Sequence, residues 1–131
     1  MIAFDTNVVV RLLVGDEPEQ YEKVLAAIRQ AELEEETIFL AGVVLCETAW
    51  VLTKSYGVPR REIADALELL ARDDRFTVER VSLVLTAVHR FAEGRGDFAD
   101  YLIGEIARAE GARTTATFDR ALRREPGFGL L

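Results

Sequence analysis

The sequence predicts an α/β fold in which a central, mostly parallel sheet is flanked by helices in three layers, and three observations indicate it. Short apolar runs alternate along the chain with longer amphipathic stretches, a pattern typical of parallel strands joined by helices. Hydrophobic residues make up 50% of the chain, enough for a buried core. The length of 131 residues and the lack of a linker or repeat predict a single domain over residues 1–131.

The individual elements follow from the spacing of apolar residues. The run at the very start of the chain, residues 1–4, predicts a buried strand. Helices are expected where apolar residues recur three and four positions apart, as Tyr21, Val24 and Ile28 do, and glycines and prolines mark their ends. Further strands are expected over 37–40, 76–78, 114–117 and 128–131, and helices over 7–14, around 21–28, and over 43–55, 63–70, 81–92 and 98–109.

Composition excludes several classes of protein. No apolar run approaches the ~20 residues of a membrane-spanning helix, so no membrane partner is expected. The single cysteine, Cys46, excludes an internal disulfide and a multi-cysteine zinc site, which favours a reducing, cytoplasmic setting. The start of the chain meets Asp5 at once and does not resemble a signal peptide. A net charge of −7 argues against a protein that holds nucleic acid by charge alone, but it allows an acidic pocket neutralised by a divalent cation.

Four carboxylates stand where a purely structural sequence would avoid them. Asp5 and Asp119 each follow an expected strand, and such positions face the crevice at the carboxyl ends of a parallel sheet. Glu47 falls in an apolar helical stripe, where burying a carboxylate is costly unless it is paired or bound to a metal. Asp100 follows Asp97 by three residues on one helix face, a like-charged pair that a cation would stabilise.

Each of these acids also has a purely structural interpretation, which the sequence leaves open. Asp5 and Asp119 are suitable helix caps, Asp97 and Asp100 suit a first helical turn, and Glu47 suits a rim position paired with an arginine. Taken together, the acids offer the oxygen ligands that Mg²⁺ and Mn²⁺ prefer. Such ions can activate water for phosphodiester hydrolysis, so no histidine base is required. The only histidine, His89, is expected at the surface or rim.

These acids and their neighbours resemble the motifs of the PIN-domain family, and specifically those of the VapC-type toxins of toxin–antitoxin pairs. The resemblance extends over almost the whole chain, in the order of the family's motifs. One departure is Gly104, where the family more often has alanine. The matching stretches are residues 4–13, 44–52, 97–103 and 117–119.

The resemblance implies an endoribonuclease that depends on Mg²⁺ or Mn²⁺. It further implies an RNA substrate, a homodimer, and inhibition by a small antitoxin protein whose tail enters the active site. Thr6 is expected to orient Asp5 or a metal-bound water. The residues that the resemblance makes catalytic and metal-binding are Asp5, Glu47, Asp100 and Asp119, and the accessory ones are Thr6, Asn7, Asp97 and Thr117.

Three other hypotheses compete with this one. A phosphotransfer domain with Asp5 as phosphate acceptor is disfavoured, because such domains use a late lysine and none follows Lys54. A PIN-like module that binds without cutting, and a PIN nuclease that matures cellular RNA, both remain open. Arginines near the motifs are candidates for contacts with RNA phosphates, although pairing with nearby acids is the commoner role for such arginines. They are Arg11, Arg95, Arg120, Arg123 and Arg124.

Overall fold

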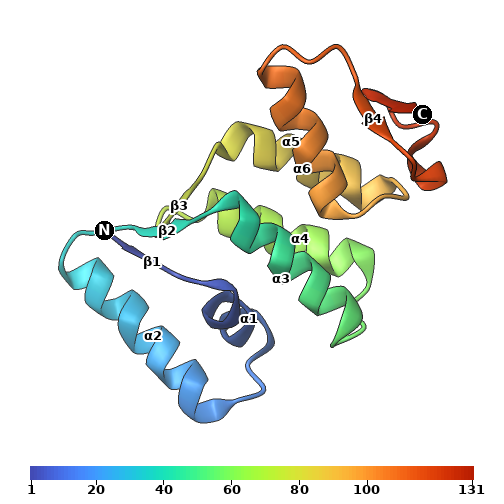
Figure 1. Ribbon diagram of the computed structural model, residues 1–131. Coiled ribbons are helices and arrows are strands. Elements are labelled where there is room, and N and C mark those ends of the chain that lie inside the picture. Colours follow the sequence, from blue (N-terminus) through green and yellow to red (C-terminus); the bar gives the residue numbers. More distant parts are fainter.

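The computed structural model describes all of residues 1–131 and confirms the α/β class, with five short strands and six α-helices (Figure 1). Helices and strands alternate as the spacing of apolar residues predicts. In chain order they are β1 (Ile2–Ala3), α1 (Thr6–Val14), α2 (Pro18–Leu33), β2 (Ile38–Leu40), α3 (Gly42–Lys54), α4 (Arg60–Arg72), β3 (Phe76–Val78), α5 (Val81–Glu93), α6 (Phe98–Ala109), β4 (Thr115–Thr117), a 3₁₀ turn (Arg120–Leu122) and β5 (Phe128–Leu130).

All strand pairs are parallel, as expected, but the strands form two sheets rather than one. The first has the order β1-β2-β3, with Ile38 opposite both Ile2 and Phe76. The second consists of β4 and β5 alone, with Thr115 opposite Phe128. Figure 1 shows β1 and β4 on opposite sides of the molecule, with helices between them. Each sheet therefore keeps an edge that no strand of the same chain covers.

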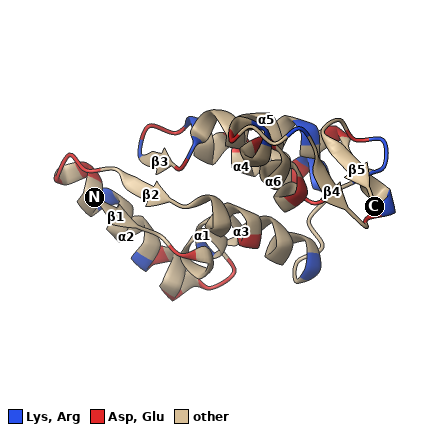
Figure 2. Cartoon of the chain, turned by 45° about the horizontal axis from the view of Figure 1, so that its top comes forward, with Lys and Arg blue, Asp and Glu red and all other residues tan.

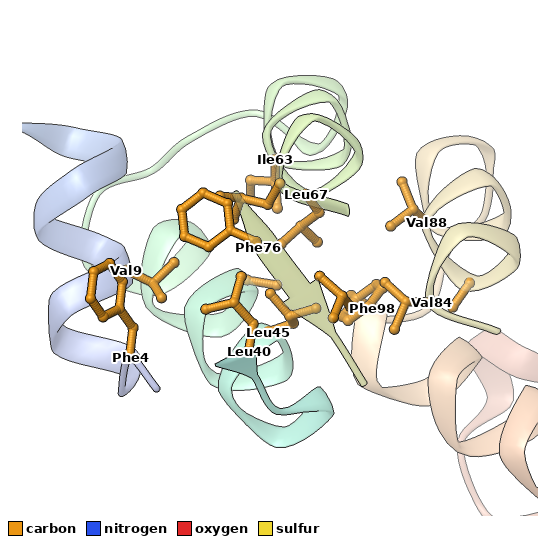
Figure 3. Packing of buried hydrophobic residues seen from close by; sticks show 14 of the residues in the cluster. Phe4, Val9, Leu40, Leu45, Ile63, Leu67, Phe76, Val84, Val88 and Phe98 are labelled. Carbon is orange, nitrogen blue, oxygen red and sulfur yellow. The ribbon is translucent and has the colours of Figure 1, made fainter. Parts of the chain in front are cut away.

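The hydrophobic core lies between the first sheet and the helices, and all six helices contribute to it. The rings of Phe4 and Phe76 pack edge to face with their centroids 6.2 Å apart. Figure 3 shows Leu67 of α4 beside Phe76, and Leu45 of α3 beside Leu40 of β2. This continuous packing fixes α3 and α6, the two helices on which acids of interest lie.

The expectation of a buried first strand is wrong. Met1, Ile2 and Ala3 are all exposed, and the side chain that reaches the core is Phe4, just after β1. The physical reason is the position of β1 at the open edge of its sheet, where nothing covers its outer side. An apolar run indicates a strand, but it cannot show whether that strand lies at the centre or the edge of a sheet.

A buried ion pair holds the C-terminal segment on α5 and α6. Glu105 is almost fully buried and accepts hydrogen bonds from Arg90 and Arg108, each at 2.8 Å. Arg90 also donates to the carbonyl oxygen of Pro126 at 2.6 Å, and its guanidinium lies 6.0 Å from the centre of the Phe128 ring. The pair thus connects two helices to the strand that ends the chain.

Gly104 allows the close approach of β5 to α6. A Cβ atom at this position would lie 3.0 Å from Cζ of Phe128, closer than side chains normally pack. The glycine at this position, noted in the sequence as a departure, therefore leaves room for the aromatic ring.

His89 is exposed, as expected from the sequence, and its Nε2 lies 2.6 Å from Oε1 of Glu68. None of the helices combines the length and the apolar character needed to span a bilayer.

Candidate active site

The first group of predicted site residues joins the end of β1 to helix α3. Asp5 caps α1, with its Oδ1 accepting a hydrogen bond from the backbone N–H of Val8 at 3.1 Å. The hydroxyl of Thr6 donates to Oε1 of Glu47 at 2.8 Å, across 41 residues of sequence. Thr6 therefore orients Glu47, whereas the sequence pointed to Asp5 or a metal-bound water as its target. Asn7 is exposed and its side chain makes no hydrogen bond.

Glu47 does not lie in a buried stripe, which corrects the expectation from its apolar neighbours. Its side chain is exposed, and so are Val43 and Trp50 on the same face of α3. The buried face of this helix carries Leu45 and Leu52 instead. No arginine pairs with Glu47, whose hydrogen-bond partner is the hydroxyl of Thr6.

The second group lies around the N-terminus of α6 and the end of β4. The backbone N–H of Asp97 donates to Oδ2 of Asp100 at 2.8 Å, so that Asp100 closes the first turn of the helix. Asp119 accepts from the backbone N–H of Ala121 at 2.9 Å and donates its own N–H to the hydroxyl of Thr117 at 3.0 Å. Thr117 thereby fixes the turn that presents Asp119.

The pKa of the Asp100 carboxyl is shifted by its surroundings. Partial burial raises its pKa above the ordinary aspartate value. The hydrogen bond from the Asp97 backbone lowers the pKa, while the negative charges of Asp97 and Asp119 raise it further. The charges of Asp97 and Asp119 therefore act directly on Asp100, and a bound cation would relieve the repulsion among the three.

The capping roles that the sequence left open are present for Asp5, Asp100 and Asp119. In each of these carboxylates, and in Glu47, one oxygen accepts a hydrogen bond and the other has no partner within the chain. A cap of this kind holds a carboxylate in place while leaving one oxygen available to a ligand. The structural and the functional interpretation are therefore compatible.

The two groups do not form a closed metal site in this structure. No three acidic, histidine or cysteine side chains lie close enough together to hold a metal ion. Carboxylate oxygens suit Mg²⁺ or Mn²⁺ chemically, so the donor types fit such an ion. Asp5 and Glu47 lie at the end of β1 and on α3, whereas Asp100 and Asp119 lie on α6 and after β4.

Four of the five arginines near the motifs have no acidic partner. Arg11 contacts Asp16 at 3.7 Å, but none of the other four forms a salt bridge. Three of them line an open groove of about 400 Å³, together with Glu93 and Glu125. Pairing with nearby acids therefore does not explain these side chains. The three that line the groove are Arg95, Arg123 and Arg124.

Cys46 is not a candidate nucleophile. Burial, and next the negative charge of the adjacent Glu47, raises the pKa of its thiol to about 11. The thiol is therefore protonated at neutral pH, and a protonated thiol is a poor nucleophile. The sequence singled this residue out only for being the lone cysteine.

Comparison with known proteins agrees with the resemblance seen in the motifs. The profile of the PIN domain matches residues 2–126, nearly the whole chain. A curated relative, described as "VapC ribonuclease" from Aquifex aeolicus (strain VF5), is 25% identical over 124 residues, which cover 95% of this chain and 91% of the relative. No solved structure matches the chain.

Proposed function

Because this chain belongs to the PIN-domain family, we propose that it is an endoribonuclease that hydrolyses RNA with Mg²⁺ or Mn²⁺. In this proposal residues 1–131 form one PIN domain, and four acids hold the metal and act in catalysis. The observation that carries the proposal is that each of these acids is fixed by one hydrogen bond and keeps a second oxygen free. The four are Asp5, Glu47, Asp100 and Asp119.

The neighbouring residues have positioning roles in this proposal. Thr6 holds the Glu47 carboxylate through its 2.8 Å hydrogen bond, and Thr117 holds the turn before Asp119. Asp97 adds negative charge beside Asp100 and fixes it through the backbone. Asn7 has no contact that supports a further role.

The groove of Arg95, Arg123 and Arg124 is the proposed path of the RNA backbone. Guanidinium groups without an acidic partner can bind phosphates in a bidentate manner and therefore suit a polyanion despite the net charge of −7. The groove lies beside the second acid group, because Arg95 precedes Asp97 by two residues and the other two arginines follow Asp119 closely. A phosphodiester bound there would lie near those carboxylates.

We further infer that the protein acts in the cytoplasm as the toxin of a toxin–antitoxin pair, as a homodimer restrained by a small antitoxin protein. The relative described as a VapC ribonuclease supports this role. A nuclease of cellular RNA maturation would use the same acids. Expression alone separates the two, because a toxin arrests growth and a small protein encoded beside it relieves the arrest.

The direct test is cleavage of tRNA and ribosomal RNA fragments by the purified chain with Mg²⁺, Mn²⁺ or EDTA. Asp100→Asn keeps the side-chain volume and removes the charge, so we expect metal-dependent cuts by the wild type and none by the variant. The matched control is Asp74→Asn, an exposed acid in a surface turn, which should cut like the wild type. Circular dichroism should show both variants folded.

Two results would contradict the proposal. Cleavage by Asp100→Asn at the wild-type rate would exclude this carboxylate from catalysis. Absence of Mn²⁺ uptake by the folded wild type in calorimetry, together with RNA binding, would instead identify a non-catalytic binding module.

A further inference from the structure

We propose that the RNA strand has a second phosphate-binding site, formed by Arg108, Arg113 and Thr115 in a pocket between α5, α6 and the start of β4. This distal pocket has a volume of about 250 Å³ and is separate from the groove lined by Arg95 and Arg123. The identification of RNA as its ligand rests on the proposed function. The presence of a phosphate site does not, and it is tested separately below.

The distal pocket and the groove are parts of one hollow surface along α5. A shallow hollow between them shares Glu93 and Glu125 with the groove. The same hollow shares Arg90 and Pro126 with the distal pocket. On α5 the lining extends from Thr86 in the distal pocket to Glu93 in the groove, roughly 10 Å at the helical rise of about 1.5 Å per residue. An RNA strand bound in the groove can therefore continue along α5 into the distal pocket.

Two arginines and a threonine in the distal pocket offer hydrogen-bond donors that no other group of the chain uses. Arg113 is exposed and forms no salt bridge. Arg108 donates from Nη2 to Glu105 and has no other acidic partner, and 73% of its side chain is exposed. The hydroxyl of Thr115, which also lines the pocket, makes no hydrogen bond. Because a guanidinium presents several donors in one plane, it binds phosphate oxygens in pairs, and these side chains therefore suit a phosphate.

The acid that lines the distal pocket is already neutralised within the protein. The side chain of Glu105 is 4% exposed, and its two oxygens accept hydrogen bonds from Arg90 and Arg108, each at 2.8 Å. This buried carboxylate also holds Arg108 in place while most of the Arg108 side chain stays exposed. An arginine that is already oriented loses less conformational freedom when it binds a phosphate.

The hollow surface as a whole is basic, although the protein is acidic. Six arginines and three glutamates line it, whereas the whole chain has a net charge of −7. Figure 2 shows blue segments around β4 and β5, while the turns at both ends of α2 are red. Positive charge concentrated on one surface draws a polyanion to that surface. The arginines are Arg90, Arg95, Arg108, Arg113, Arg123 and Arg124.

An RNA strand suits the distal pocket better than an acidic segment of a protein. Ala112 and Pro126 are the only apolar side chains of its lining. Interfaces between proteins have an apolar core with large side chains, whereas interfaces with nucleic acids are polar and positively charged. The distal pocket therefore fits a sugar–phosphate backbone, which requires donors and no apolar anchor.

Binding of short and long RNA strands tests the distal pocket without cleavage. Labelled single strands of about 4 and about 12 nucleotides, lengths that single-strand grooves hold, are titrated in EDTA and followed by fluorescence anisotropy. We expect Arg113→Ala to weaken binding of the long strand at least about fivefold, as loss of a charged hydrogen bond does, and to change binding of the short strand much less. Arg113→Lys keeps the charge and should restore most of the affinity.

The matched control is Arg29→Ala, which removes an exposed arginine of α2 that has no acidic partner. This variant should bind both strands like the wild type. Equal affinity of Arg113→Ala and the wild type for the long strand would overturn the proposal. An equal loss for the short and the long strand would also overturn it, because the distal pocket would then not be a second site.

Nuclear magnetic resonance separates the possible sources of the phosphate. The amide signals of Arg113 and Thr115 are followed in EDTA while the long RNA strand, inorganic phosphate or polyglutamate is added. We expect inorganic phosphate to shift these signals only at a concentration at least about 100-fold higher than the RNA does, because a free ion lacks the additional contacts in the groove. Saturation by inorganic phosphate or by polyglutamate at the concentration of the RNA would overturn the proposal and indicate a free anion or an acidic protein as the ligand.

The same spectra distinguish failure of this proposal from failure of the proposed function. If the long strand shifts the signals of Arg123 and Arg124 but not those of Arg113 and Thr115, the distal pocket lies outside the RNA path and the proposed function stands. If inorganic phosphate shifts the signals of Arg113 and Thr115 but RNA shifts no signal of the protein, RNA is wrong both as the ligand of the pocket and as the substrate.

Discussion

Replacing Glu105 by alanine tests how the C-terminal strands are held on the helices. The Glu105 side chain is 4% exposed and that of its partner Arg90 is 20% exposed, so the change leaves a largely buried guanidinium without its carboxylate. Removing one partner of a buried pair costs roughly 3–5 kcal/mol. We expect about 3 kcal/mol, at the lower end of that range, because Arg90 keeps its hydrogen bond to Pro126 and its position over the Tyr101 ring.

Thermal and urea unfolding, followed by far-ultraviolet circular dichroism, measure this loss. For a chain of this length, a loss of about 3 kcal/mol lowers Tm by about 10 °C. The matched control is Glu110→Ala at the end of the same helix, whose side chain is 68% exposed and pairs with Arg80, and it should cost less than about 1 kcal/mol. If Glu105→Ala were no more harmful than Glu110→Ala, the buried pair would not hold the C-terminal segment on the helices.

Three further predictions follow from individual contacts. Tyr101→Phe should cost about 2 kcal/mol in urea unfolding, because the buried hydroxyl accepts from two backbone N–H groups and donates to a carboxylate. A loss below about 0.5 kcal/mol, the cost of an ordinary surface change, would contradict this expectation. Cys46 should react slowly with iodoacetamide at pH 8.5 and faster as the pH approaches about 11. Glu47→Gln should speed this reaction, because it removes a negative charge beside the thiol. Equal rates in the wild type and in Glu47→Gln would show that this charge does not act on the thiol. The double change Arg123→Ala and Arg124→Ala should weaken RNA binding, measured in the inactive Asp100→Asn chain. The slope of the logarithm of the binding constant against the logarithm of salt concentration should fall by about 0.7 for each lost phosphate contact. An unchanged slope would show that these arginines do not contact the RNA backbone.

Local spacing predicted the elements well because helices and strands depend on residues close in sequence. The strands near residues 37–40 and 76–78, and the last strand near residues 128–131, lie where their apolar runs indicated. The acids at Asp5 and Asp119 could be placed at strand ends for the same reason. The division into two sheets could not be predicted, since it depends on which distant edges meet, and the pattern of a strand is the same at an edge and at the centre.

Long-range contacts of single side chains were equally inaccessible to the sequence. Glu105 appears as an ordinary surface acid, and Arg108 three residues later is a hint of a helical pair, but Arg90 comes from another helix. The exposed position of Glu47 was missed because an apolar stripe indicates a face that is buried against something. The apolar stripe on α3 does not itself show which element, if any, covers it.

The central claim is that four acids from two separate groups act in one reaction. The most direct measurement is the rate of Mn²⁺-dependent RNA cleavage by Asp5→Asn, Glu47→Gln, Asp100→Asn and Asp119→Asn, beside the wild type and Asp74→Asn. We expect each of the four changes to lower the rate by at least about 100-fold, as loss of a group that stabilises transition-state charge does, and Asp74→Asn to leave it unchanged. Full activity of both Asp5→Asn and Glu47→Gln, or of both Asp100→Asn and Asp119→Asn, would contradict the claim. Cleavage would then not require that group of acids.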